Sequence, residues 1–177
     1  TFEESNLNRQ LFSNEHNLGQ SKVKEACARM QNINSNVNCE IVDEAIASDN
    51  IMDALVGVDI VIDCVDNLKT RYMMQDACKS LNIPMVHGAV GAWQGQVSTI
   101  FPGDETISKI YGKGYTEEIA SVGTASFLPA TIASYQVSEC VKVFISKGEI
   151  LRHKVLYVDI LNNQTYTVDF NEHPEDA

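Results

Sequence analysis

Residues 58–64, VDIVIDC, form a nearly continuous run of apolar and mostly β-branched side chains. Such a run is typical of a parallel strand that is covered on both faces of its sheet. A helical pattern follows at about 68–81, and a second apolar run follows at 83–90. This strand–helix–strand order predicts a parallel βαβ unit, and therefore an α/β fold.

The segment before this unit extends the alternation. Apolar side chains recur at helical spacing over 21–33, and Ser21 can cap that helix. We expect a strand at 37–46. The stretch SDNIMDALVG then predicts a short helix, with Ser48 or Asp49 as its N-cap.

The segment after the unit predicts a strand at 96–101 and a long helix at 126–147, with Pro129 in its first turn. Residues 104–124 have no clear periodicity, and we expect a mobile crossing loop there. KVLYVDI and QTYTVDF alternate and predict a terminal antiparallel hairpin. The expected fold is a Rossmann-like, doubly wound sheet with an antiparallel extension and a C-terminal hairpin, in one domain over 1–177.

Composition restricts the function classes. The 177 residues contain 13 Lys and Arg against 24 Asp and Glu, a net charge of −11. This acidity argues against a nucleic-acid partner, because phosphate backbones attract clustered Lys and Arg. We also expect no membrane partner, because no apolar run approaches the roughly 20 residues of a membrane helix and no signal-peptide pattern is present.

The cysteines indicate a compartment and argue against zinc. All five are widely spaced, without a CxxC pair, whereas structural zinc sites usually have ligands at short spacing. Their apolar contexts favour buried thiols in a reducing compartment. We therefore expect a cytoplasmic protein without zinc.

Two segments follow the carboxyl ends of the predicted buried strands, and α/β sheets bind their ligands at these ends. Asp66 and Asn67 follow the first strand, and the glycine-rich stretch 88–96 follows the second. A carboxylate at such a strand end can hold a divalent metal. The alternative is that Asp66 or Asn67 only caps the helix that begins near Leu68, and both roles can coexist.

Two cations precede the sheet. Arg9 has a planar guanidinium, and Lys22 lies in the first turn of a helix, where its charge opposes the helix dipole. A bound phosphate would explain Lys22, because free amides at a helix start also attract anions. The alternative is a solvated surface lysine. Neither GxGxxG nor GxxxxGK[ST] occurs in the chain.

Two further residues stay ambiguous. His87 ends the predicted strand at 83–90, where it is either functional or simply hydrogen-bonded to the backbone. Trp93, the single tryptophan, lies in the glycine-rich turn and either contacts a partner or packs on the sheet.

Several blocks together resemble one family. They are SNLNRQ (5–10), GQSK (19–22), QNINSN (31–36), DIVIDCVDNLKTR (59–71), IPMVHGAVGAWQGQV (83–97) and FPGD (101–104). In this order they resemble the ThiF/MoeB/HesA family, the bacterial relatives of the ubiquitin-activating enzymes. The combination is specific, although each block alone is a weak signal.

This resemblance implies an adenylyltransferase. Such a protein uses ATP and Mg²⁺ to adenylate the C-terminal glycine of a small ubiquitin-like sulfur carrier with a Gly-Gly tail, and acts as a homodimer. By the resemblance, Asn6, Arg9 and Lys22 contact the nucleotide phosphates. Asp66 holds Mg²⁺ at the phosphates, and Asn67 lies near the nucleotide.

The sequence also departs from the family pattern. It begins after the usual glycine-rich ATP loop and acidic ribose-binding segment, so we expect an N-terminally incomplete domain. The zinc-binding CxxC pairs are absent. Ser121 stands about where some members have a carrier-binding cysteine, and serine is a poor nucleophile without activation.

Two alternatives to an active adenylyltransferase remain. One is a catalytically silent family member that only binds a carrier or another partner. The other is a dinucleotide-binding oxidoreductase, because one fold can serve many functions. SNLNRQ and VDN argue against the oxidoreductase, since hydride transfer has no use for this set of cations and metal ligand.

Overall fold

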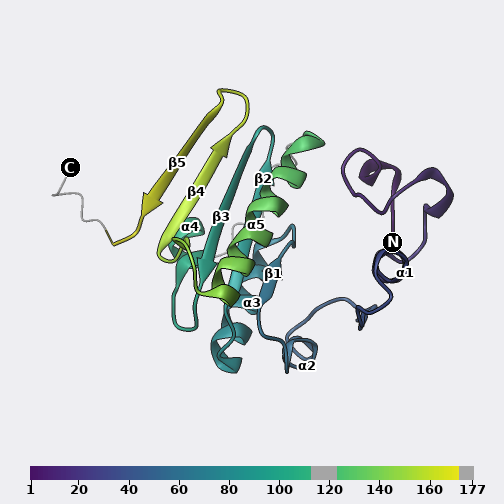
Figure 1. Cartoon of the computed structure of the whole chain (residues 1–177), viewed down its shortest axis with the longest axis horizontal. Helices are drawn as coiled ribbons and strands as arrows, with labels where there is room; N and C mark the ends of the chain where they lie inside the picture. The colour runs from purple at the N-terminus through teal and green to yellow at the C-terminus, as the bar shows by residue number, and fades with distance from the viewer. Residues whose placement is uncertain (113–122, 172–177) are drawn as a thin grey trace. The chain divides into compact units, whose positions relative to one another are not determined.

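A computed structural model gives the structure of the chain and describes residues 1–112 and 123–171 (Figure 1). The chain divides into two compact units, Thr1–Ala45 and Ile46–Ala177.

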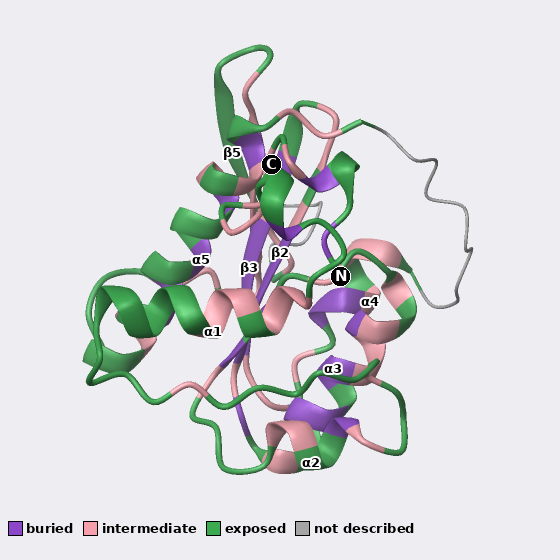
Figure 2. Cartoon of the chain, turned by 90° about the vertical axis from the view of Figure 1, so that its right-hand side faces the viewer, coloured by how far each residue is buried: buried purple, intermediate pink, exposed green. Residues whose placement is uncertain are grey.

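The first unit contains two short 3₁₀ helices, η1 (Glu4–Asn6) and η2 (Glu15–Asn17), and the helix α1 (Lys22–Ile33). The Ser21 hydroxyl accepts a hydrogen bond from the Lys24 amide, which confirms the expected N-cap. None of the residues of α1 is buried, in agreement with Figure 2.

The prediction of a strand at 37–46 is wrong. These residues form no strand, and the apolar side chains of Val37, Ile41 and Val42 are exposed. A strand needs a hydrogen-bonded partner, whereas this segment is attached to α1 through side chains. Asp43 accepts a hydrogen bond from the Ser21 hydroxyl at 2.8 Å and pairs with Lys24 at 2.9 Å.

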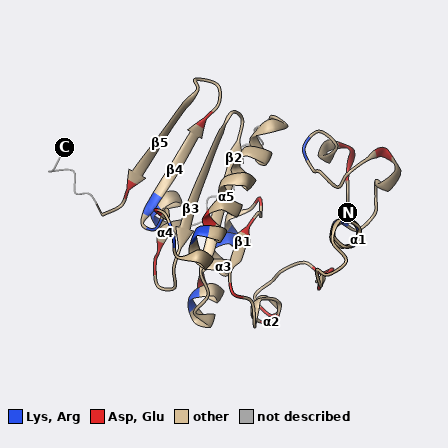
Figure 3. Ribbon diagram, in the orientation of Figure 1, with Lys and Arg blue, Asp and Glu red and all other residues tan. Residues whose placement is uncertain are grey.

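The second unit is built on a five-stranded sheet with the order β1-β2-β3-β4-β5. The strands are β1 (Val61–Asp63), β2 (Met85–Gly91), β3 (Gln94–Ile100), β4 (Lys154–Asp159) and β5 (Gln164–Asp169). β1 and β2 are parallel and the other neighbours are antiparallel, so the parallel start, the antiparallel extension and the hairpin are confirmed. β2 and β3 contain no charged side chain (Figure 3).

Helices cover both faces of this sheet. They are α2 (Ile51–Leu55), α3 (Leu68–Leu81), α4 (Thr106–Tyr111) and α5 (Phe127–Ile145). Met85 packs in the core beneath α2, α3 and α4, whereas the next residue, Val86, packs beneath α5. Because successive strand side chains point to opposite faces, α5 lies on one side of β2 and α3 on the other.

Two details differ from the predictions. The N-cap of α2 is Asn50, rather than Ser48 or Asp49. The expected loop 104–124 contains α4, in which Thr106 and Ile107 are buried and the Ile107 amide donates to Gln75 Oε1 at 3.0 Å. Ser121 and the rest of 113–122 lie outside the described residues.

In the part of the chain that the structure describes, no helix combines the length and the apolar character needed to cross a membrane.

Candidate active site

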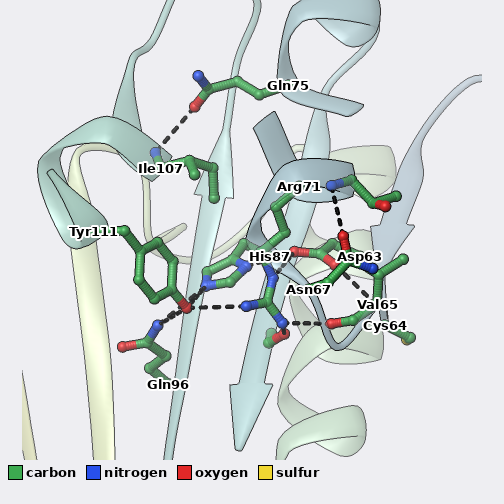
Figure 4. A network of polar contacts seen from close by, with 12 residues as sticks. Asp63, Cys64, Val65, Asn67, Arg71, Gln75, His87, Gln96, Ile107 and Tyr111 are labelled. Atoms are coloured by element: carbon green, nitrogen blue, oxygen red, sulfur yellow. Dashed lines mark hydrogen bonds and ion pairs between the residues drawn. The ribbon is translucent and has the colours of Figure 1, made fainter. Parts of the chain in front are cut away.

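The Asp63 carboxylate is the centre of a buried polar network at the carboxyl end of β1 (Figure 4). Its Oδ2 accepts hydrogen bonds from Arg71 Nε at 2.9 Å and from His87 Nδ1 at 2.6 Å. Its Oδ1 accepts from the Val65 amide at 3.1 Å. This carboxylate therefore joins α3 and β2 to the loop that follows β1.

Arg71 extends the network from the first turns of α3. Its side chain is only 6% exposed, and its Nη2 donates to the Val65 carbonyl at 2.5 Å and to the Gly88 carbonyl at 3.3 Å. Its Nη1 donates to the Tyr111 hydroxyl at 3.3 Å. One guanidinium thus contacts the loop, β2 and α4.

The donor and acceptor roles in these hydrogen bonds determine the protonation state of His87. The Tyr111 oxygen accepts from Arg71 Nη1 and from Gln96 Nε2, so its proton is free to be donated to His87 Nε2 at 3.2 Å. His87 then donates its Nδ1 proton to Asp63. This arrangement requires a neutral imidazole protonated on Nδ1.

Burial also favours the neutral form. It lowers the pKa of His87 below the ordinary value of about 6.5, although the neighbouring Asp63 carboxylate acts in the opposite direction. The fully buried ring loses its hydration, and the positive charge of Arg71 lowers the pKa further.

The pKa direction of His87 predicts a pH dependence of stability. Below about pH 6.5 the unfolded chain binds a proton that the folded chain does not, so the free energy of unfolding falls as the pH falls. Above that pH the contribution is fully present. Urea titrations between pH 7.5 and 5.5 measure it. His87→Asn should flatten the slope, and a His87→Asn protein with the wild-type slope would contradict the assignment.

Gln136 on α5 braces the same region from the other face of the sheet. Its Nε2 donates to the Asp63 carbonyl at 2.8 Å and to the Val86 carbonyl at 3.2 Å. A Cβ atom on Gly88 would lie 2.4 Å from Gln136 Cδ. The absence of a side chain at Gly88 therefore leaves the space that this amide occupies.

Gly88→Ala should destabilise the protein by about 1–3 kcal/mol, because the added methyl displaces Gln136 from its two carbonyl acceptors. Gly91 is a matched control in the same strand, since a Cβ there meets nothing within 4 Å and its φ is not positive. Gly91→Ala should change the free energy of unfolding by no more than about 0.5 kcal/mol. Denaturant titration of both variants gives the comparison, and equal losses would refute the role of Gln136.

The loop 64–67 contains Asp66, the predicted metal ligand, and its neighbour Asn67. Asn67 is the N-cap of α3, and its Oδ1 accepts a hydrogen bond from the Thr70 amide at 2.9 Å. Asp66 is exposed, and within the described residues its carboxylate has no hydrogen-bond or ion-pair partner. The capping alternative therefore holds for Asn67 and leaves Asp66 available to a ligand.

The donor set fits magnesium bound together with a phosphate. Among the described residues no group of three or more His, Cys, Asp and Glu could hold a metal by itself. Mg²⁺ is commonly held by one or two carboxylates plus substrate phosphates. A single exposed carboxylate at Asp66 suits this mode.

The other predicted site residues lie in the first unit. Asn6 is buried at the end of η1, and its Oδ1 accepts a hydrogen bond at 3.1 Å from the amide of Glu3, the N-cap of η1. Arg9 Nη1 donates to the Ser5 carbonyl at 2.6 Å, and Lys22 is the first residue of α1. Backbone hydrogen bonds of Phe2 with Gly19 and Gln20 join GQSK to the segment just before SNLNRQ within this unit.

Sequence reasoning missed the residues that support the loop: Asp63, Arg71 and Gln136 are buried, and Gln96 and Tyr111 are partly buried. A charged residue at the end of an otherwise apolar strand was the available signal for Asp63.

The ring nitrogens of His87 are hydrogen-bonded by side chains rather than by the backbone. Trp93 is 43% exposed and packs against Phe127 with ring centroids 5.2 Å apart.

The sheet, its flanking helices and the acidic loop after β1 define a Rossmann-like α/β protein. The chain belongs to the ThiF family, whose model matches residues 1–177. The family resemblance predicted from the motif blocks is thus confirmed.

Two curated relatives are similar over most of this chain. A SAMP-activating enzyme E1 of Haloferax volcanii is 30% identical, over 98% of this chain and 66% of that protein. The adenylyltransferase and sulfurtransferase MOCS3-1 of Zea mays is 31% identical, over 89% of this chain and 35% of that protein. The chain therefore spans between about one third and two thirds of these relatives.

Solved structures share the fold. MccB of E. coli aligns with a TM-score of 0.83 at 15% identity, over 98% of this chain and 54% of that chain. The selenomethionine structure of PaaA aligns with a TM-score of 0.73 at 15% identity, over 96% of this chain and 61% of that one. At these identities the likeness concerns the fold alone.

Proposed function

We propose that this chain is the part of an ATP-dependent adenylyltransferase that activates the C-terminal glycine of a small ubiquitin-like sulfur carrier. The observation that supports it most is the exposed Asp66 carboxylate, which has no partner among the described residues, on a hydrogen-bonded loop at the end of β1 in a chain of the ThiF family. The names of the relatives, an E1 enzyme and an adenylyltransferase, favour the same chemistry.

The residues receive their roles from the family motifs. Asn6, Arg9 and Lys22 bind the nucleotide phosphates, and Asn67 lies near the nucleotide. Asp66 holds Mg²⁺, which when bound neutralises phosphate charge and orients the α-phosphate. The enzyme acts as a homodimer and takes a carrier that ends in Gly-Gly.

The chemistry requires charge neutralisation more than proton transfer. A carrier carboxylate oxygen attacks the α-phosphorus, a new oxygen–phosphorus bond forms, and the bond to the β-phosphate oxygen breaks to release pyrophosphate. The attacking carboxylate is already ionised, so no general base is needed. Arg9 and Lys22 counter the repulsion between this anion and the triphosphate.

ATP–pyrophosphate exchange in the natural-length protein tests the proposal. We expect exchange that depends on Mg²⁺ and on a carrier ending in Gly-Gly, and no exchange with the same carrier truncated by those two glycines. A protein that binds such carriers but catalyses no exchange with any of them would be the catalytically silent alternative, and the proposal would be wrong.

A further inference from the structure

The loop that presents Asp66 is held by a buried ion pair that the family motifs do not assign to the reaction. We propose that Arg71, oriented by Asp63, is a positioning residue that sets the conformation of the loop 64–67 and thereby the place of the Asp66 carboxylate. This inference rests on the proposed function for its catalytic consequence, but its structural part can be tested without any activity.

Val65, immediately before Asp66, is held on both sides of its backbone. Its amide donates to Asp63 Oδ1 at 3.1 Å, and its carbonyl accepts from Arg71 Nη2 at 2.5 Å. The Val65 carbonyl lies in the planar peptide group that joins Val65 to Asp66. Holding that oxygen therefore orients the backbone from which the Asp66 side chain projects.

The guanidinium is itself tied to rigid elements. Its Nε donates to Asp63 at the end of β1 (Figure 4). Its Nη2 also donates to the Gly88 carbonyl in the middle of β2. The Asp63 carbonyl is held in turn by Gln136 of α5. The loop is thus placed relative to two neighbouring strands of the sheet, and not only relative to α3.

The planar shape of arginine is essential to this arrangement. Four acceptors surround Arg71, namely Asp63 of β1, Val65 of the loop, Gly88 of β2 and Tyr111 of α4. A guanidinium presents five N–H donors in one plane, whereas a lysine ammonium presents three from a single atom. Lysine can keep the charge pair with Asp63 but cannot bond all four acceptors.

Stability alone does not explain a buried charge pair at this position. Arg71 and Asp63 have side chains 6% and 0% exposed, and removing two charges from water costs about as much as their attraction returns. Apolar residues of similar volume would fill the space at no greater cost. Apolar residues could not donate a hydrogen bond to the Val65 carbonyl, and this hydrogen bond is what the charge pair adds.

The test compares Arg71→Lys with Arg152→Lys in the natural-length protein. Arg152 also pairs with an aspartate, at 3.0 and 3.1 Å from the Asp104 carboxylate, but its side chain is 44% exposed and makes no bond to the loop. For Arg71→Lys we expect the Mg²⁺ concentration at half-maximal exchange to rise by about 10-fold, in the range seen when outer partners of metal ligands are removed. The KM for the carrier should not change, and Arg152→Lys should match the wild type.

Hydrogen–deuterium exchange of the amides of residues 64–67 gives a second readout that is independent of activity. These amides should exchange faster in Arg71→Lys than in the wild type or in Arg152→Lys. A folded Arg71→Lys protein with wild-type amide exchange would overturn the positioning role, whatever its Mg²⁺ dependence. If the wild type shows no pyrophosphate exchange with any carrier, the proposed function fails, and the amide exchange alone decides the positioning role.

Circular dichroism shows whether Arg71→Lys folds. If it does not, Tyr111→Phe replaces it, because this variant removes the acceptor of Arg71 Nη1 and leaves the ion pair intact. We then expect a smaller increase in both the Mg²⁺ requirement and the amide exchange of the loop. Wild-type values of both quantities in Tyr111→Phe would overturn the proposal.

Discussion

Asp66→Asn should lower carrier-dependent ATP–pyrophosphate exchange by about 100-fold or more, which is the scale of losing one principal electrostatic contact in a transition state. The amide keeps the size of the side chain but removes the charge that holds Mg²⁺ at the phosphates. Because Asp66 is exposed and unpartnered among the described residues, the fold should be unaffected. Initial exchange rates at saturating ATP and carrier measure the effect.

Asp76→Asn is the matched control for this variant, since Asp76 is an exposed aspartate of α3 in the same unit. It should retain wild-type exchange, and both variants should have wild-type melting temperatures. Retention of more than about a tenth of the rate by Asp66→Asn, a loss of less than about 1.4 kcal/mol of transition-state stabilisation, would refute its role as the metal ligand. Equal losses in both variants would point to net charge rather than to a site.

The second large effect concerns stability. Asp63→Ala should lower the free energy of unfolding by about 3–5 kcal/mol, because it leaves the buried Arg71 charge without its partner. It also removes the acceptors of the His87 ring and of the Val65 amide. Urea titration followed by far-ultraviolet circular dichroism measures the loss.

Glu149→Ala is the control, because Glu149 pairs with Lys154 at 2.7 Å but has a side chain 77% exposed. An ion pair in that setting contributes little, so its removal should cost far less than that of Asp63. Similar losses for the two variants would mean that removing Asp63 does not leave Arg71 as an uncompensated buried charge.

Elements with strong local signals were predictable from the sequence. α3 has helical periodicity over 14 residues and the asparagine cap at Asn67, and the β4–β5 hairpin has two alternating segments around a polar turn. The strand predicted at 37–46 failed because apolar alternation does not supply a pairing partner. α4 was missed because six residues are too few for a periodic pattern, and its stability comes from the buried Ile107 and its bond to Gln75.

The candidate site was predictable in part for the same reason. Asp66 and Asn67 follow a recognisable strand, so their position alone indicated a ligand edge. The supporting network joins residues far apart in the chain: Tyr111 lies 40 positions after Arg71, and Gln136 lies 73 after Asp63. Such pairs depend on how the sheet brings strands and helices together, and a single sequence contains no periodic signal for them.

Intact-mass measurement of the carrier tests the central claim most directly. The natural-length protein is incubated with ATP, Mg²⁺ and a small ubiquitin-like carrier that ends in Gly-Gly, with inorganic pyrophosphatase present to remove the released pyrophosphate. We predict that the carrier gains the mass of one adenylyl group, which is AMP less one water, and that it gains none when Asp66→Asn replaces the wild type. Carriers that bind the protein but never gain AMP would contradict the assignment of this chain to an adenylyltransferase.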